Sequence, residues 1–162
     1  MPALEGAGKY CVTKEDLLKV NALWPEKYNG LIFPLFIEDQ LVMYSIRYFT
    51  GDLKSRSFGS LKSNYILPHR NRTCVIVEDV ISGIKVHKAG YSCLVLFGSY
   101  SPKEKIASLN YDKYILWLDA DKAKEGVTYT RGIRNMQQVI TVEDPKRYSI
   151  RGVQDTLANI AF

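Results

Sequence analysis

The sequence predicts an α/β fold in which a parallel central sheet is flanked by helices, preceded by a small N-terminal antiparallel α+β lobe. Short apolar, β-branched runs alternate with helix-like segments between residues 74 and 142, and acidic residues follow two of these runs. Strand–helix–strand alternation implies right-handed crossovers and a parallel sheet. Functional residues of such sheets lie beyond the carboxyl ends of the strands. The acidic residues therefore mark the expected position of a functional site.

The N-terminal part predicts a helix followed by a hairpin. Residues 14–24 form a short amphipathic pattern, with Thr13 as the N-cap and Asp16 three residues later. Residues 31–49 alternate as two antiparallel strands around the turn Glu38–Gln40. The first ten residues predict no defined element.

The remaining elements follow in chain order. Strands are expected at 74–78, 91–98, 114–118 and 137–142, and helices at 79–89, 101–110, 121–136 and 150–162. Gly90 ends the first helix, and Ser101 with Pro102 begins the second. The third should be short, because Gly126 and Val127 are poor interior helix formers. The predicted division is a lead-in at 1–29, a β-rich basic lobe at 30–71 and an α/β domain at 72–162.

Three carboxylates are predicted to meet at one edge of the sheet. Glu78 ends one strand, Asp119 ends another, and Asp121 stands two residues further on. In an extended segment Asp119 and Asp121 would point the same way while Ala120 packs inward. Oxygen ligands favour Mg²⁺ or Mn²⁺ over zinc and suit a phosphate-bearing substrate. An isolated Asp-x-Asp is often turn or helix-cap chemistry, but Glu78 on the neighbouring strand favours a metal site.

Four segments, read in order, resemble the Toprim core of phage-type DNA primases. VIVEDVISGIKV and ILWLDADKA resemble the Glu and Asp-x-Asp motifs, VEDPKRYS resembles a later DPK segment, and GLIFPLFIEDQLVMYSIRYF resembles the segment that precedes Toprim. Together they span roughly residues 30 to 152. The chain departs from many Toprim sequences in having Asp79 and Ser82 where those have Gly and Asp.

The resemblance implies a Toprim fold and metal-dependent synthesis of RNA primers on single-stranded DNA from ribonucleoside triphosphates. It implies Glu78 as general base or metal-held carboxylate, Asp119 and Asp121 as holders of Mg²⁺ (or Mn²⁺), and Asp144 as a further metal ligand. Residues expected to contact nucleotide or template are Arg47, Lys54, Arg56, Lys62, Lys122 and Lys146. A replicative helicase or a separate zinc-binding module are the candidate protein partners.

Two alternatives remain open for the same residues. A Toprim nuclease would use the acids to activate water against a phosphodiester, and a non-catalytic replisome module would keep them as structural caps. The segment upstream of residue 50 favours a primase, and a length of 162 residues leaves no room for the gate domain of a topoisomerase.

The positive charge is concentrated in one segment. The chain carries a net charge of +5, and residues 47–72 alone contain six basic residues against Asp52. Tyr48, Phe49, Phe58 and Tyr65 are interleaved with these charges. This pattern favours a strip that contacts phosphates while rings stack on bases; the alternative is a solvated basic face with aromatics turned to the core.

The composition excludes several classes of protein. Cys11, Cys74 and Cys93 lack metal-ligand spacing, so no zinc finger is encoded, and the latter two are expected as buried thiols. The longest apolar stretch contains charges and Pro34, which excludes a membrane span and a signal peptide. We expect a cytoplasmic protein, in the host cell if the chain is viral. His69 and His87 are not at ligand spacing.

Overall fold

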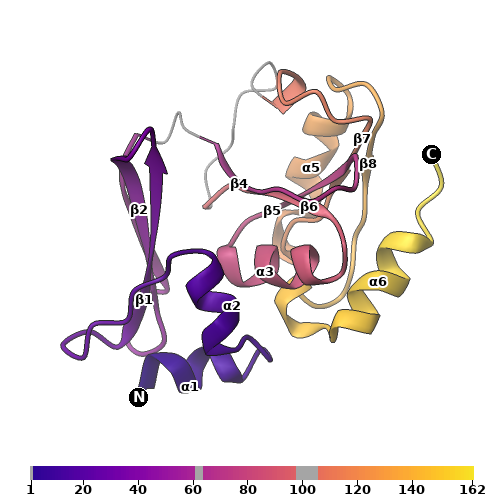
Figure 1. The fold of residues 1–162 in the computed structure, drawn as a ribbon. Helices are drawn as coiled ribbons and strands as arrows, with labels where there is room; N and C mark the ends of the chain where they lie inside the picture. The colour runs from indigo at the N-terminus through magenta and orange to yellow at the C-terminus, as the bar shows by residue number, and fades with distance from the viewer. Residues whose placement is uncertain (1, 61–63, 98–105) are drawn as a thin grey trace. The chain divides into compact units, whose positions relative to one another are not determined.

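The computed structural model describes residues 2–60, 64–97 and 106–162, and the chain divides into two compact units, Met1–Ser63 and Asn64–Phe162 (Figure 1). The predicted helix start at Ser101 and Pro102, and the predicted binding residue Lys62, lie outside the described residues. The unit boundary falls eight residues before the predicted one because Tyr65–Leu67 pairs with a strand of the second unit. The predicted lead-in, 1–29, belongs with the hairpin in the first unit.

The first unit places two helices with a three-stranded antiparallel sheet of order β1-β2-β3. Its elements are α1 (Pro2–Gly8), α2 (Lys14–Lys19), β1 (Gly30–Ile37), β2 (Gln40–Tyr48) and β3 (Ser55–Gly59). The predicted capping box is present, since Thr13 and Asp16 each accept the other's backbone N–H. Helix α1 and strand β3 had no counterpart in the prediction.

Pro34 lies on the edge of β1 that does not pair with β2. The backbone of Ile32 exchanges hydrogen bonds with Leu23, on the side away from β2, at 2.9 and 2.8 Å. Pro34, two residues on, faces the same way and has no N–H to donate. This edge is therefore protected against pairing with another strand. The hairpin turn uses Glu38 and Asp39 with φ of 49° and 63°.

The second unit is built on a five-stranded sheet of order β4-β6-β5-β7-β8, in which only β4 is antiparallel. Its elements are β4 (Tyr65–Leu67), β5 (Thr73–Val77), α3 (Val80–Lys88), β6 (Ser92–Val95), β7 (Lys113–Leu116), the 3₁₀ turn η1 (Ala120–Lys122), α5 (Ala123–Thr130), β8 (Met136–Gln138), the 3₁₀ turn η2 (Pro145–Arg147) and α6 (Ile150–Ala158). The predicted α/β class with a mostly parallel sheet and a separate antiparallel sheet is confirmed.

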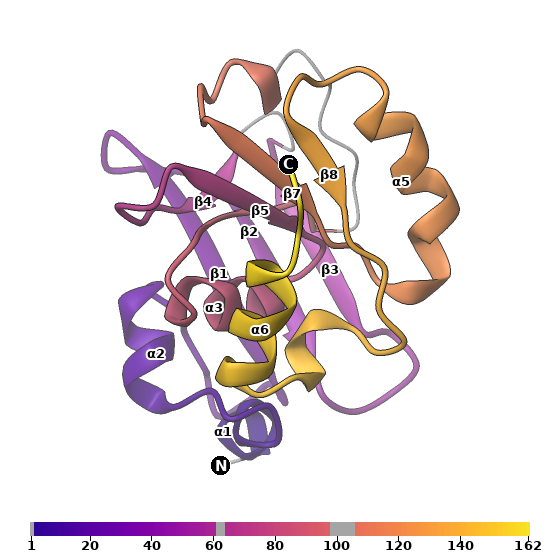
Figure 2. The ribbon, with the colours of Figure 1, turned by 90° about the vertical axis from the view of Figure 1, so that its right-hand side faces the viewer.

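Helices cover both faces of this sheet. Figure 2 shows α3 and α6 on one side and α5 on the other. Helix α3 approaches β6 closely because Gly83 has no side chain; a Cβ there would lie 2.9 Å from Val95. Under α5, the core contains Cys74, Ile76, Leu94, Tyr114, Leu116, Tyr129 and Met136. Gly126 does not break α5; its missing Cβ leaves room for the side chain of Gln138.

Cys74 and Cys93 are buried in strands, as predicted, and burial raises the pKa of both thiols, that of Cys74 to about 12. His69 and His87, distant in sequence, have ring centroids 5.6 Å apart. Among the described residues, no helix is long and apolar enough to cross a membrane.

Candidate functional site

Carboxylates collect at the carboxyl ends of neighbouring strands β5 and β7. Glu78 directly follows β5, and Asp79 is the N-cap of α3, accepting the backbone N–H of Ser82 at 2.9 Å. Trp117 extends the pairing past β7 by donating its backbone N–H to Ile76 at 2.9 Å. Asp119 follows, and its backbone N–H donates to Oε2 of Glu78 at 3.2 Å. The topology expected from the sequence therefore does bring Glu78 and Asp119 together.

Two lysines bind these carboxylates. Lys122 Nζ lies 2.7 Å from Oε1 of Glu78. Lys146 Nζ lies 3.1 Å from Oδ2 of both Asp79 and Asp144 and 4.0 Å from Oδ2 of Asp119. We call Glu78, Asp79, Asp119 and Asp144 the acid cluster. Its four carboxylates meet two ammonium groups, so it carries two excess negative charges when fully ionised.

Burial and neighbouring carboxylates destabilise the ionised form of Asp119. Burial raises the pKa of Asp119 to about 7; Lys146 opposes this rise, whereas Glu78, Asp144 and Asp79 add to it. One of its oxygens, Oδ1, is buried and has no hydrogen-bond partner among the described atoms. A buried carboxylate oxygen without a donor is costly, and a cation beside Oδ1 would remove that cost.

The two lysines remain charged for related reasons. Burial acts to lower the pKa of Lys146, but the charges of Asp79, Asp119 and Asp144 outweigh it and raise that pKa. The pKa of Lys122 is raised chiefly by its hydrogen bond to Glu78. Lys146 is 5% exposed, so its ammonium group is held inside the cluster. Both lysines therefore act as cations at neutral pH.

A second buried lysine supports the backbone of Lys146. Lys85, on the buried face of α3, is 2% exposed and donates from Nζ to the carbonyl oxygen of Lys146 at 2.9 Å. Asp79 is held in turn by the hydroxyl of Ser82, which donates to its Oδ2 at 3.2 Å. Asp79 and Lys85 were missed as site residues in the sequence. An Asp at a helix start and a Lys on the apolar face of a helix were the available signals.

The predicted geometry of the Asp-x-Asp pair is wrong. Asp119 has extended backbone (φ −59°, ψ 149°), but the chain turns at once into η1, so Asp121 lies in a 3₁₀ turn and is exposed. Ala120 is exposed as well, rather than packed inward. The reason is that Lys122 donates its backbone N–H to the carbonyl of Asp119 at 2.9 Å, which closes the turn.

The donor set fits a hard divalent cation, although the ligands are not preassembled. Among the described residues, no group of three or more His, Cys, Asp or Glu side chains is arranged to hold a metal ion. The cluster offers only carboxylate oxygens, which Mg²⁺ and Mn²⁺ prefer, and Oδ1 of Asp119 is without a partner. Magnesium usually takes few protein carboxylates and keeps several waters. Glu78, Asp119 and Asp144 are the candidate holders.

The predicted nucleotide- and template-binding residues before position 60 belong to the first unit. Lys54 and Arg56 are exposed, and the guanidinium of Arg56 lies 4.8 Å above the ring of Phe58. Phe58 in turn stacks on Tyr44 with centroids 4.9 Å apart. Arg47 is half-buried, 6.0 Å from the centroid of Phe49. A cation beside stacked rings is suited to contact nucleic acid.

Tyr65, expected among the stacking rings, is 4% exposed in β4 and packs edge-on against Phe97. Burial raises its pKa above the usual range. The stacking role proposed for Tyr65 from the sequence is therefore wrong, because this ring belongs to the packed edge of the second unit.

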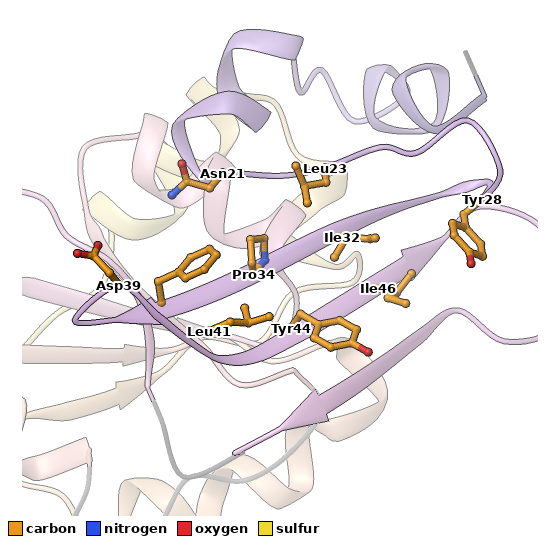
Figure 3. Close-up of a pocket in the computed structure, with 10 residues that line it drawn as sticks. Asn21, Leu23, Tyr28, Ile32, Pro34, Asp39, Leu41, Tyr44 and Ile46 are labelled. Atoms are coloured by element: carbon orange, nitrogen blue, oxygen red, sulfur yellow. The ribbon is translucent and has the colours of Figure 1, made fainter.

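The first unit also contains an open apolar groove of about 830 Å³ (Figure 3). It lies between one face of the β1–β2 hairpin and the segment that follows α2. The lining residues are Asn21, Leu23, Tyr28, Ile32, Pro34, Phe36, Asp39, Leu41, Tyr44 and Ile46. Tyr44 lines the groove and also stacks on Phe58. The strand register pairs Ile46 with Arg56, so the groove residues of β2 share a face of the sheet with Arg56.

Two solved primase structures share this fold. The Mycobacterium tuberculosis primase DnaG RNA polymerase domain matches with a TM-score of 0.61 and 17% identity, over 90% of this chain and 62% of that chain. The Aquifex aeolicus primase, comprising zinc-binding and RNA polymerase domains, matches with a TM-score of 0.59 and 13% identity, over 90% of this chain and 48% of that chain. No family model matches the sequence, and neither does any curated protein.

The chain thus spans about half to three-fifths of the length of these primase chains. The similarity covers both units of the fold, since nine-tenths of the chain is matched. At 13% and 17% identity, this similarity shows the fold alone. The chain has an α/β architecture similar to that of primase RNA polymerase domains.

Proposed function

We propose that the chain is a Toprim-type primase core that makes short RNA primers on single-stranded DNA. The observation that carries the proposal is the acid cluster, in a fold similar to primase RNA polymerase domains. Three of its members stand at the carboxyl ends of β5 and β7, and Asp144 joins them from the start of η2. The phage-type assignment rests on the motifs around Glu78, Asp119 and Asp144.

Glu78 and Asp119 would act as a pair at the reacting groups. The backbone N–H of Asp119 donates to the Glu78 side chain and fixes that carboxylate beside the loop that carries Asp119. Such positioning is what phosphoryl-type transfer requires. Glu78 would receive or stabilise the proton of the attacking 3′-hydroxyl. Asp144, whose Oδ2 lies 3.1 Å from Lys146 Nζ, would complete the set.

Mg²⁺ or Mn²⁺, when bound, would supply Lewis-acid neutralisation of the triphosphate. Glu78, Asp119 and Asp144 would hold it, and the exposed Asp121 is a further candidate holder. Lys122 is 32% exposed at its side chain. It can therefore exchange its ion pair with Glu78 for a contact with substrate phosphate.

The first unit would bind the template. Lys54 and Arg56 are exposed cations, and the Tyr44–Phe58 stack beneath Arg56 offers aromatic surface. Phosphates would bind the cations while bases contact the rings, as in other single-strand binding surfaces. A helicase or a zinc-binding module would act as a partner of this core.

The test is to incubate the protein with single-stranded DNA, the four ribonucleoside triphosphates and Mg²⁺ or Mn²⁺. We expect short RNA products whose sequence is complementary to the template. Degraded template without RNA would instead support a Toprim nuclease, and template binding without either product would support a non-catalytic replisome module.

A further inference from the structure

We propose that Lys146 is a built-in counter-ion that holds the acid cluster together in the absence of a divalent ion and is displaced when one binds, and that Lys85 positions it. The proposal rests on the proposed metal site but concerns residues with a different task. It assigns Lys146 to the carboxylates rather than to substrate phosphate.

The contacts of Lys146 support this role. Its ammonium group lies within 4.0 Å of three carboxylates, at 3.1 Å from Asp79 and Asp144 and 4.0 Å from Asp119. At 5% exposure it cannot reach a ligand in solution without leaving this place. An ammonium group can neutralise carboxylates, but unlike a metal ion it cannot offer coordination sites to a substrate.

Charge explains why the cluster needs such a group. Without Lys146, Asp79, Asp119 and Asp144 would repel one another in a partly buried space, which costs free energy that the rest of the fold must supply. With Lys146 and Lys122 in place, two excess negative charges remain when all four carboxylates are ionised. The cluster can therefore be folded before the metal arrives and still attract it, and one excess negative charge remains once a divalent cation has displaced Lys146.

Geometry explains why Lys146 can be displaced without unfolding the site. Its main chain is held independently of its side chain: Lys85 Nζ donates to the Lys146 carbonyl at 2.9 Å, and Arg147 donates its backbone N–H to Asp144 at 2.9 Å. Helix α3 and η2 pack together around this contact. The side chain can therefore swing away while Asp144 keeps its position.

Competition between the ammonium group and a metal ion makes a measurable prediction. Calorimetric titration with Mg²⁺ or Mn²⁺ alone, on the full chain, should show about tenfold tighter binding by Lys146→Met than by the parent, since a neighbouring positive charge has been removed. Lys85→Met should shift the affinity less and in the same direction. The double variant should bind like Lys146→Met, because Lys85 acts through Lys146. Lys124→Met, an exposed lysine on α5, should bind like the parent.

Equal or weaker metal binding by Lys146→Met, or no binding by either protein, would overturn the proposal. A second measurement uses only the parent protein and tests the proposal even if Lys146→Met does not fold. In the parent, an amine-reactive reagent read by mass spectrometry should label Lys146 several-fold faster with Mg²⁺ than without, whereas Lys124 should not change. Unchanged labelling of Lys146 would overturn displacement. Primer synthesis by the parent is assayed separately. If the parent makes primers but Lys146→Met binds the metal ion no more tightly than the parent, the counter-ion role of Lys146 is refuted and the proposed function is not.

Discussion

The backbone N–H of Asp119 donates a 3.2 Å hydrogen bond to Oε2 of Glu78, which joins the ends of β5 and β7 through a side chain. The other oxygen of Glu78 binds Lys122 at 2.7 Å. Glu78 therefore has two tasks that use different atoms: one oxygen orders the loop that carries Asp119, and the other meets a cation. A substitution that keeps the shape but not the charge can separate them.

Glu78→Gln should preserve the fold and reduce activity. The Gln carbonyl oxygen can still accept from Asp119, whereas the ion pair with Lys122 and the negative charge are lost. We expect a loss of about a hundredfold or more in primer synthesis with little change in the free energy of unfolding measured in urea. Glu78→Ala, which removes both contacts, should lose stability as well. A Glu78→Gln protein as active as the parent would exclude Glu78 from the chemistry.

The raised pKa of Asp119 predicts a pH-dependent stability. Because burial raises this pKa from its unfolded value near 4 to about 7, the folded state holds a proton that the unfolded state has lost between these pH values. The stability that this group contributes should therefore be fully present below about pH 4 and should be lost as pH rises to about 7. A rise of this size in pKa corresponds to a change on the order of 3–4 kcal/mol, to be measured by urea unfolding in the absence of metal.

Asp119→Asn provides the control for that measurement. The variant should lack this decline and should be more stable than the parent at pH 8, because it buries no charge at position 119. Adding Mg²⁺ should flatten the decline in the parent by favouring the ionised carboxylate. Identical pH profiles for the two proteins would show that Asp119 titrates normally.

Close packing of α3 on β6 predicts a cost for any side chain at Gly83. A Cβ there would lie 2.9 Å from Val95 and 3.4 Å from the sulfur of Cys93, both buried. Gly83→Ala should lower the free energy of unfolding by about 1–3 kcal/mol. Gly8→Ala, in α1 with nothing within 4 Å of the added Cβ, should be close to neutral. Equal stability of the two variants would contradict the packing described for α3.

Much of the fold was predictable because its signals are local. The apolar run before Glu78 predicts β5, Asp79 and Gly90 mark the limits of α3, and the Glu38–Asp39 turn marks the hairpin. Helix α1 was missed since its sequence, PALEGAG, contains two glycines and little apolar periodicity. Its existence depends on packing: Gly6 lies directly against the ring of Phe49, a contact that no local pattern encodes.

The site was predictable only in part. Glu78 and Asp119 could be paired because parallel strands end at one edge. The partners of these acids could not be found, since Lys85 and Lys146 are 61 positions apart and meet only through the packing of α3 on η2. The prediction of an extended Asp-x-Asp segment was wrong because one backbone hydrogen bond, from Lys122 to Asp119, turns the chain.

The exposed cations of the first unit should give DNA binding a strong salt dependence. Replacing Lys54 and Arg56 together with Ala should reduce the log–log slope of single-stranded DNA affinity against salt by about one to two, because each phosphate contact contributes roughly 0.7. Binding to all sequences should weaken equally. The double variant Lys9→Ala/Lys27→Ala removes two exposed lysines of the same unit and should leave the slope unchanged. Equal slopes for both double variants would show that Lys54 and Arg56 contact no phosphate.

The most direct measurement compares template-directed RNA synthesis by the parent, Asp119→Asn and Asp112→Asn under saturating Mg²⁺ or Mn²⁺. Asp112 is an exposed acid paired with Arg72, so its variant controls for lost surface charge. We predict primers from the parent and from Asp112→Asn, and a loss of roughly a thousandfold or more from Asp119→Asn, with all three proteins folded by circular dichroism. Full primer synthesis by Asp119→Asn would contradict the assignment of the acid cluster as the site of nucleotidyl transfer.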